Sequence, residues 1–339
     1  MEDSTLRSIV DRVRAGEKFA VGLLAHVQGS APQRPGARLI VLPEGVMHGT
    51  VGGGCLEMET RRRALDALRT GVPDLFELRL DDDFGWDDGL ICGGRTTLLV
   101  SPHPERAAAA IERALAERDA GRRALLATVI AAPGSEDVGR AFALPPGGGS
   151  VDCLPFPVAA PEGPKPTRLE QDGWRVFVES VRPAPTLVVM GCGHIGAVLV
   201  EMAAKVGFRV VAVDDRADYA NANRLPAAAE VRCDDMLAAA RDLPSGPDTY
   251  WVIVTRGHRN DGKVLAEVIN RESAYLGMIG SRRKVRIIRE GIVGEGIATA
   301  EQFARVHSPV GLDIGAESPQ EIGLAIAAEL VAVRHGKRD

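Results

Sequence analysis

The chain is 339 residues long, with 45% hydrophobic and 4% aromatic residues, which is enough for two domains with sizeable cores. Its formal net charge of −5 argues against a nucleic-acid-binding protein, because such proteins usually carry a basic surplus. No apolar run reaches the roughly 18 residues of a membrane span, and the charged, amphipathic N-terminus is unlike a secretory signal.

The first half of the chain predicts a mixed α/β domain. Apolar residues at helical spacing predict a first helix between Leu6 and Val13. A Pro- and Gly-rich segment, Pro145–Pro166, is interpreted either as a linker or as an irregular loop. The "RPAP" stretch places a boundary near Pro183, so we expect domains 1–182 and 183–339. Further strands are predicted at 19–29, 37–45, 75–80, 96–100, 124–132 and 174–181, and helices at 56–68 and 104–120.

The second half alternates strands and helices. Strands are predicted at 186–191, 209–215, 249–257 and 274–280. Helices are predicted at 196–207, 263–271, 282–291 and 318–335. This alternation is typical of a parallel sheet covered by helices on both faces.

The stretch "GCGHIG" follows the first of these strands and opens a helix, as a dinucleotide-binding loop does. Gly191 would allow the tight turn, Gly193 the approach of a pyrophosphate, and Gly196 close packing of helix and strand. Asp214 ends the next strand, where a carboxylate can bind ribose hydroxyls. His194 would contact a phosphate or cap the helix. The alternative is a Rossmann scaffold kept for docking, in which the glycines serve only the turn.

Two further loops should gather at the same sheet edge, because ligands bind at the carboxyl ends of parallel strands. "TRGHRND" and "GSRRK" follow the strands that end near Val254 and Ile279. "GSRRK" has the composition of an anion site, or of a solvated basic helix start. The candidate ligand-binding residues on these loops are Arg256, His258, Ser281, Arg282 and Lys284, and Arg216, which follows Asp214 and Asp215, is a further candidate at this edge.

Two of the five cysteines stand beside glycine pairs, in "GTVGGGCLEME" and "LICGGRTTLLV". The odd, widely spaced set predicts reduced thiols in the cytoplasm, and neither Cys55 nor Cys92 has a neighbour at zinc-ligand spacing. Because glycine admits a ligand close to the backbone, we expect these two thiols to react or to contact a ligand. The alternative is a packing role, which we assign mostly to the other three cysteines, with Cys192 as the exception because it lies within the nucleotide loop. The adjoining candidates are Gly52, Gly53, Gly54, Gly93 and Gly94.

Several motifs together carry a family resemblance. "GSAPQRPGARLIV", "GTVGGGCLE" and "CGG" resemble the N-terminal domain of the XdhC/CoxI family. "GCGHIG", "VAVDDR", "GMIGSRRK" and "HSPVGLDIGAESPQEIGLAIAAELV" resemble the C-terminal Rossmann domain of that family. The resemblance covers nearly the whole chain apart from its middle segment. It implies an N-terminal mixed α/β domain followed by a Rossmann-like parallel-sheet domain.

The resemblance also implies a function. Members are accessory proteins of xanthine dehydrogenase and carbon monoxide dehydrogenase, which bind molybdenum cofactor, support its sulfuration and deliver it to the apo molybdenum hydroxylase. The cargo would be molybdopterin or its cytosine dinucleotide, with Cys55 or Cys92 as a molybdenum contact. A cysteine desulfurase as sulfur donor and a homodimer are expected, and neither nucleic acid nor a membrane is an expected partner. Gln28, Ser30, Arg34 and Arg38 lie on the first motif and could contact the ligand, although both arginines could be surface charges.

Two other functions stay open. An NAD(P)-dependent oxidoreductase would use the glycine fingerprint for hydride transfer, but the sequence offers no convincing catalytic acid and leaves the thiol motifs unexplained. A docking module would recruit a sulfurtransferase to the dehydrogenase. We expect a maturation and insertion factor rather than a stand-alone enzyme.

Overall fold

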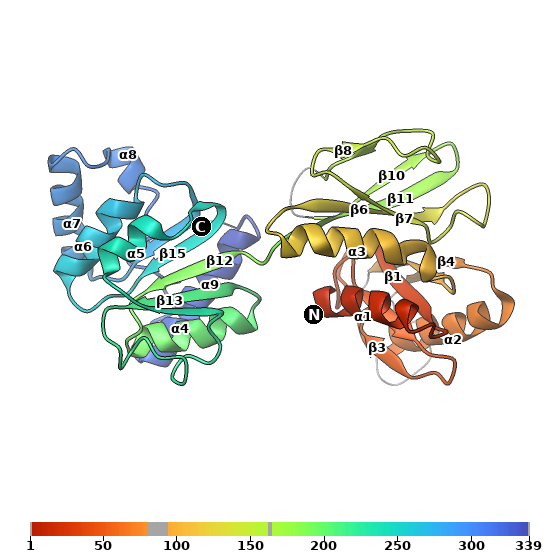
Figure 1. Ribbon diagram of the computed structural model, residues 1–339, viewed down its shortest axis with the longest axis horizontal. Coiled ribbons are helices and arrows are strands. Elements are labelled where there is room, and N and C mark those ends of the chain that lie inside the picture. The colour runs from red at the N-terminus through yellow and green to blue at the C-terminus, as the bar shows by residue number, and fades with distance from the viewer. Residues whose placement is uncertain (1, 80–93, 162–164, 338–339) are drawn as a thin grey trace. The chain divides into compact units, whose positions relative to one another are not determined.

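A computed structural model describes residues 2–79, 94–161 and 165–337. The chain forms two compact units, Met1–Pro183 and Ala184–Asp339, each with its own buried core (Figure 1). No helix within the described ranges combines the length and the apolar character that crossing a membrane requires.

The first unit contains a five-stranded sheet of order β3-β2-β1-β5-β4. Its central strand, β1 (Ala20–Gln28), pairs antiparallel with β2 (Arg38–Val41) and with β5 (Arg95–Ser101). The edge strands are β3 (Met47–Gly49) and β4 (Asp74–Arg79). The helix α2 (Gly54–Thr70) packs its apolar side on one face of this sheet.

A second sheet of order β10-β11-β6-β7 completes this unit. Two helices, α1 (Glu2–Arg14) and α3 (Glu105–Asp119), share a hydrophobic cluster with residues of both sheets. The strands are β6 (Ala124–Ala131), β7 (Ala141–Leu144), β10 (Thr167–Gln171) and β11 (Trp174–Val181).

The Pro- and Gly-rich middle segment is packed against the second sheet. It forms a small ribbon of β8 (Gly148–Gly149) and β9 (Val158–Ala159). Leu154 and Val158 are buried among residues of β6 and β11. Of the two alternatives for this segment, the structure therefore contradicts the linker, because a linker would not bury apolar side chains in a core.

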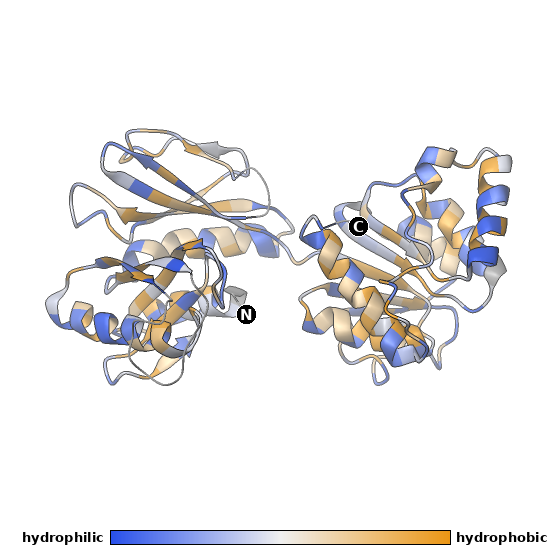
Figure 2. Cartoon of the chain, turned by 180° about the vertical axis from the view of Figure 1, so that it is seen from behind, coloured by the Kyte–Doolittle hydropathy of each residue, from blue (hydrophilic) through white to orange (hydrophobic). Residues whose placement is uncertain are grey.

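The second unit is a parallel sheet of order β14-β13-β12-β15-β16. Its inner strands are continuous apolar runs, as expected of strands buried on both faces, and they are orange in Figure 2. The helices α4 and α9 cover one face, and α5, α6, α7 and α8 the other. The strands are β12 (Thr186–Met190), β13 (Arg209–Asp214), β14 (Glu230–Cys233), β15 (Gly246–Ile253) and β16 (Ser273–Met278). The helices are α4 (His194–Lys205), α5 (Met236–Asp242), α6 (His258–Val268), α7 (Arg282–Gly294), α8 (Ala300–Phe303) and α9 (Pro319–Arg334).

The predicted fold class is confirmed: a mixed α/β unit precedes a Rossmann-like parallel sheet. The elements without a sequence prediction are β3, β7, β8, β9, β10, β14, α5 and α8, which are short, and most of which show little apolar periodicity. The strand order reverses between β12 and β15, and ligands of such sheets bind at this point, beyond the carboxyl ends of the strands.

Candidate functional site

Three motifs of the first unit meet beside the end of β1 and the start of β5. A side chain at Gly94 would place its Cβ 2.2 Å from the carbonyl oxygen of Ser30 and 3.1 Å from that of Gln28. A Cβ at Gly52 would lie 3.6 Å from Pro32. The segment that begins at Ser30 therefore lies beside both glycine-rich motifs. Only glycine fits at position 94, because a backbone oxygen cannot move aside as a flexible side chain can.

The thiol loop, residues 50–55, is held by two side chains. Its N–H groups at Gly52 and Gly53 donate to the Thr50 hydroxyl, at 3.2 Å, and to the Glu57 carboxylate, at 3.1 Å. The Thr50 hydroxyl in turn donates to Glu57. Glu57 was not among the predicted site residues. An acidic residue in the first turn of a helix is the signal that could have identified it.

Cys55 is exposed in the first turn of α2, which begins at Gly54. The helix starts from Gly53, whose φ of 72° favours glycine. The thiol therefore lies at the surface, at the N-terminal end of the helix. The other predicted thiol, Cys92, and its neighbour Gly93 lie outside the described residues.

The two arginines of the first motif have different environments. Arg34 is exposed. Arg38 is buried, forms an ion pair with Glu179 of β11, and donates to the Gly36 carbonyl at 2.8 Å. Arg38 is therefore not a surface charge. Its guanidinium links the two sheets of the unit and fixes the end of the first motif.

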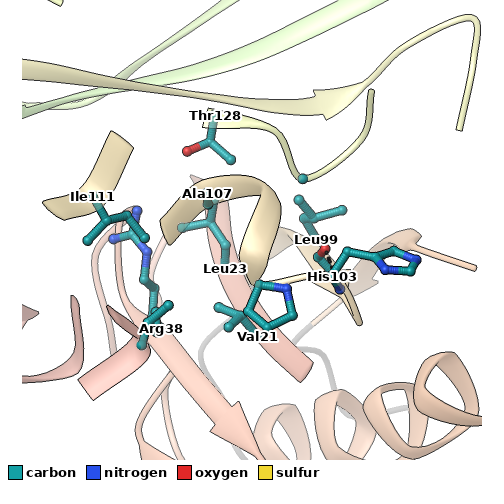
Figure 3. A pocket seen from close by; sticks show the side chains of 12 residues that line it. Val21, Leu23, Arg38, Leu99, His103, Ala107, Ile111 and Thr128 are labelled. Carbon is teal, nitrogen blue, oxygen red and sulfur yellow. Dashed lines mark hydrogen bonds between the residues drawn. The ribbon is translucent and has the colours of Figure 1, made fainter. Parts of the chain in front are cut away.

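Arg38 also lines a small cavity between the two sheets, of about 40 Å³ (Figure 3). The other labelled residues around it are mostly apolar, with His103 and Thr128 as the polar exceptions. This volume suits one or two water molecules. It is too small for a cofactor, so the candidate site is the exposed loop edge, where the predicted residues gather.

In the second unit, the glycine loop, residues 191–196, has the geometry of a phosphate-binding turn. Gly191 has φ 111°, and a Cβ at Gly196 would lie 1.9 Å from the Gly191 carbonyl oxygen. Gly193 differs, because its φ of −63° suits any residue and a Cβ there would meet no atom within 4 Å. Neither strain nor packing requires glycine at this position. Gly193 is the N-cap of α4, so the start of that helix faces open space.

Asp214 ends β13 as predicted, but its carboxylate is already occupied. It accepts the Cys192 N–H at 2.8 Å and the Arg216 Nε and Nη2 at 2.8 and 3.0 Å. Burial raises the pKa of Asp214, but the hydrogen bonds from Arg216 and Cys192 outweigh it and leave the pKa below its ordinary value. In this structure Asp214 fixes the glycine loop rather than presenting a free acid to a ribose.

The loop residues Cys192 and His194 differ in burial: Cys192 is buried and His194 is exposed. Cys192 is fully buried, and burial raises the pKa of its thiol to about 12. It is thus a packing residue. His194 is exposed as the first residue of α4, and its side chain does not cap the helix. The structure therefore contradicts the capping role considered for His194, and its contact with a phosphate stays a prediction.

The loops after β15 and β16 are joined by a buried ion pair. Asp261 is 0% exposed and accepts the N–H and hydroxyl of Thr255, at 3.0 and 2.6 Å. Lys284 donates to the same carboxylate and to the Ile279 carbonyl at 3.0 Å. Lys284 is therefore committed to an internal partner, whereas the sequence predicts a ligand-binding cation.

The remaining candidates of these loops lie at the surface. Arg256 and Arg282 are exposed, and Ser281 is the N-cap of α7, where its hydroxyl accepts the Lys284 N–H at 3.3 Å. His258 begins α6, but its side chain lies outside the described residues. Exposed cations therefore lie beyond the carboxyl ends of β15 and β16.

A cluster that sequence reasoning missed holds the segment after α8. Glu329 of α9 accepts His307 Nδ1 at 2.7 Å, the Gly311 N–H at 2.7 Å and the Tyr275 hydroxyl. The ring centroids of Tyr275 and His307 are 4.4 Å apart. This network gives the "HSPVG" motif a structural role, because its hydrogen bonds to Glu329 hold the segment between β16 and α9 in place.

Comparisons with known proteins match both units to one family. Residues 12–79 match the XdhC and CoxI family, and residues 187–330 match the XdhC Rossmann domain. The crystal structure of a xanthine dehydrogenase from Bacillus halodurans superposes with a TM-score of 0.79, over 100% of this chain and 97% of that one, at 22% identity. At that identity the likeness shows a shared fold.

Three curated relatives align with nearly the whole chain. The uncharacterized protein YqeB of Escherichia coli is 25% identical over 94% of the chain, which spans only 44% of that relative. A probable xanthine dehydrogenase subunit of Bacillus subtilis is 24% identical over 94% of both chains. The molybdenum cofactor insertion chaperone PaoD of E. coli is 24% identical over 98% of this chain and 89% of its own. With both of its units matched, the chain belongs to the XdhC and CoxI family.

Proposed function

We propose that this protein binds molybdenum cofactor and delivers it to an apo molybdenum hydroxylase of the xanthine or carbon monoxide dehydrogenase type. One observation carries the proposal: the glycine loop that bears the exposed Cys55 thiol lies beside the segment that begins at Ser30, and Gly94 contacts the same segment. The name of the E. coli insertion chaperone supports the same role.

The thiol loop suits the molybdenum end of such a cargo. Thiolate is a soft ligand of the kind that binds transition metals through sulfur. The Cys55 thiol is exposed in the first turn of α2, where a ligand can reach its sulfur. Gly53 and Gly54 add no side chain that would keep a bulky ligand away. Cys92 and Gly93 belong to the proposed contact set on sequence grounds alone.

The glycine loop of the second unit, taken by itself, suits a phosphate group. Gly193 leaves open space at the start of α4, where helix N–H groups attract anions. The exposed His194, Arg256 and Arg282 add polar and cationic groups at the same sheet edge. This arrangement supports a phosphorylated ligand, either molybdopterin or its cytosine dinucleotide.

Sulfuration is the finer part of the proposal. In it, the protein supports exchange of an oxo for a sulfido ligand on molybdenum, with a cysteine desulfurase as sulfur donor and a homodimer as the working form. The oxidoreductase alternative is less well supported, because the acid that would hold a nicotinamide-dinucleotide ribose is engaged by Arg216.

The test uses protein purified from a host that makes the cofactor. Molybdenum is measured by mass spectrometry and the pterin by the fluorescence of its oxidised form. We expect stoichiometric amounts of both in the parent and at least a fivefold loss of molybdenum in Cys55→Ala. The matched control is Cys233→Ala, which removes an exposed thiol at the end of β14.

The client side is tested by adding the loaded protein to apo xanthine dehydrogenase. Activity should appear with the parent and with Cys233→Ala, and should be strongly reduced with Cys55→Ala. Equal cofactor loading and equal activation by all three proteins would show that the Cys55 thiol takes no part. A parent that contains neither molybdenum nor pterin would refute the proposed function.

A further inference from the structure

We infer that Arg216 is a specificity residue of the second unit: it closes the ribose position of the Rossmann sheet. The glycine loop would then accept phosphate monoesters, or pyrophosphates whose second half extends away from β13, but no ligand that needs a sugar diol bound at the tip of β13. This inference rests on the proposed function, since both assign a phosphorylated ligand to the glycine loop.

The contacts of Asp214 carry the inference. In dinucleotide-binding sheets the acid at the end of the second strand accepts hydrogen bonds from ribose hydroxyls. Here one carboxylate oxygen accepts the Arg216 N–H at 3.1 Å and Nε at 2.8 Å. The other oxygen accepts Arg216 Nη2 at 3.0 Å and the Cys192 N–H at 2.8 Å. Asp214 is 1% exposed, so a sugar has no access to either oxygen while the guanidinium is in place.

The guanidinium is held from its other side as well. It lies 3.7 Å from the ring centroid of Tyr219, and the guanidinium of Arg224 lies 4.7 Å from the same ring. Stacking on an aromatic face and a two-pronged bond to a carboxylate together fix a planar group in one orientation. A ligand sugar would have to displace Arg216 from both partners at once.

This arrangement has a consequence for the cargo. A molybdopterin monophosphate needs only the glycine loop and the helix start. A cytosine dinucleotide would bind with its cytidine toward β15 and β16, where Arg256 and Arg282 are exposed. A nicotinamide dinucleotide would lose its ribose contact on β13.

The first test compares two probes on the parent protein by isothermal titration calorimetry. Pyrophosphate reports the glycine loop alone, and ADP-ribose adds a ribose diol beside the same group. We expect the two dissociation constants to agree within threefold. An affinity for ADP-ribose that is at least tenfold higher would overturn the inference, because the ribose position would then be open.

The second test removes the guanidinium that occupies the Asp214 carboxylate. Arg216→Ala should raise the affinity for ADP-ribose, and for NADH, at least tenfold relative to pyrophosphate. Arg224→Ala is the matched control, since it removes the other arginine on Tyr219 without touching Asp214, and it should give no such gain. Arg216→Leu, which keeps a side chain against Tyr219 but has no group that donates to Asp214, replaces the alanine variant if that variant unfolds.

Two other results would also settle whether Arg216 closes the ribose position. A folded Arg216 variant that gains no affinity for ADP-ribose would overturn the inference. So would a parent that binds NADPH tenfold more tightly than NADH, because Arg216 would then be receiving a 2′-phosphate. Failure of the proposed function can be distinguished from failure of this inference. The first would appear as absence of molybdenum and pterin, whereas the second is measured by the affinity for ADP-ribose relative to pyrophosphate.

Discussion

Lys284 at the start of α7 donates to the carboxylate of Asp261, which is wholly buried and also holds the Thr255 hydroxyl at 2.6 Å. This contact joins the loops that follow β15 and β16 at the carboxyl edge of the sheet. Because Asp261 is fully buried, water cannot replace Lys284 as its partner. We therefore expect the loss of this ion pair to lower the stability of the protein more than its affinity for a ligand.

Lys284→Met should destabilise the protein by about 3–5 kcal/mol, because it leaves a buried carboxylate without its cation. Lys263→Met is the control, as Lys263 is exposed on α6, and its free energy of unfolding should change by less than about 0.5 kcal/mol. Urea unfolding of the full chain measures both. Equal midpoints for the two variants would show that the Asp261 pair contributes little.

Gly193→Val should leave the protein folded and weaken pyrophosphate binding at least tenfold. The backbone there suits a side chain and a Cβ meets no atom within 4 Å, so the valine would fill only the space a phosphate needs. Gly246→Val, at the opposite end of the sheet and also in open space, should bind as the parent does. Calorimetric titration measures the affinity of each variant for pyrophosphate. An unchanged affinity in folded Gly193→Val would mean that the glycines of the fingerprint serve only the turn.

Gly94→Ala should destabilise the first unit by about 1–3 kcal/mol, the usual cost of an added group in a tightly packed place. Its Cβ would lie 2.2 Å from the Ser30 carbonyl oxygen, so the first motif would have to move. Gly147→Ala adds the same methyl group where no atom lies within 4 Å. Thermal unfolding should therefore separate the two variants, and similar melting temperatures would contradict the close contact between the motifs.

The ionisation of Asp214 should contribute fully to stability above about pH 4, and this contribution should fade progressively below it. Its folded pKa lies below the ordinary value of 3.8, so the contribution is complete above that value and is lost as the pH falls through the folded pKa. The free energy of unfolding of the parent minus that of Asp214→Asn should thus be constant from pH 7 to about pH 5 and shrink toward pH 3. A difference independent of pH would show that the carboxylate charge is not what Arg216 and the Cys192 N–H recognise.

Iodoacetamide should distinguish the thiols. Cys55 and Cys233 are exposed and should be alkylated quickly at pH 8, whereas Cys192 is buried with its pKa raised to about 12 and should react only after unfolding. Peptide mass spectrometry gives the rate for each site. Rapid labelling of native Cys192 would mean that the glycine loop opens readily.

The sequence predicted the Rossmann unit well because its signals are local. Apolar strands, helical periodicity and the glycines of the loop at 191–196 each reflect a preference of a few neighbouring residues, and the parallel sheet follows from their alternation. Short elements such as β14 and α8 escaped prediction because their few residues show no period. Of the three cysteines interpreted as mostly structural, Cys192 is buried, although its place in the nucleotide loop made it the exception to that interpretation, and Cys233 is exposed.

Only the tertiary structure decided which polar side chains are free to meet a ligand. Arg38, Asp214 and Lys284 looked like ligand-binding residues in the sequence, yet each has an internal partner: Glu179 is 141 residues away from Arg38, and Asp261 is 23 residues away from Lys284. Asp214 is occupied by Arg216, two positions along the chain, and by the Cys192 N–H of the glycine loop. A local pattern reports what a residue can do chemically, but a charge is neutralised by whatever folding brings within hydrogen-bond distance, and that distance is a property of the packed chain.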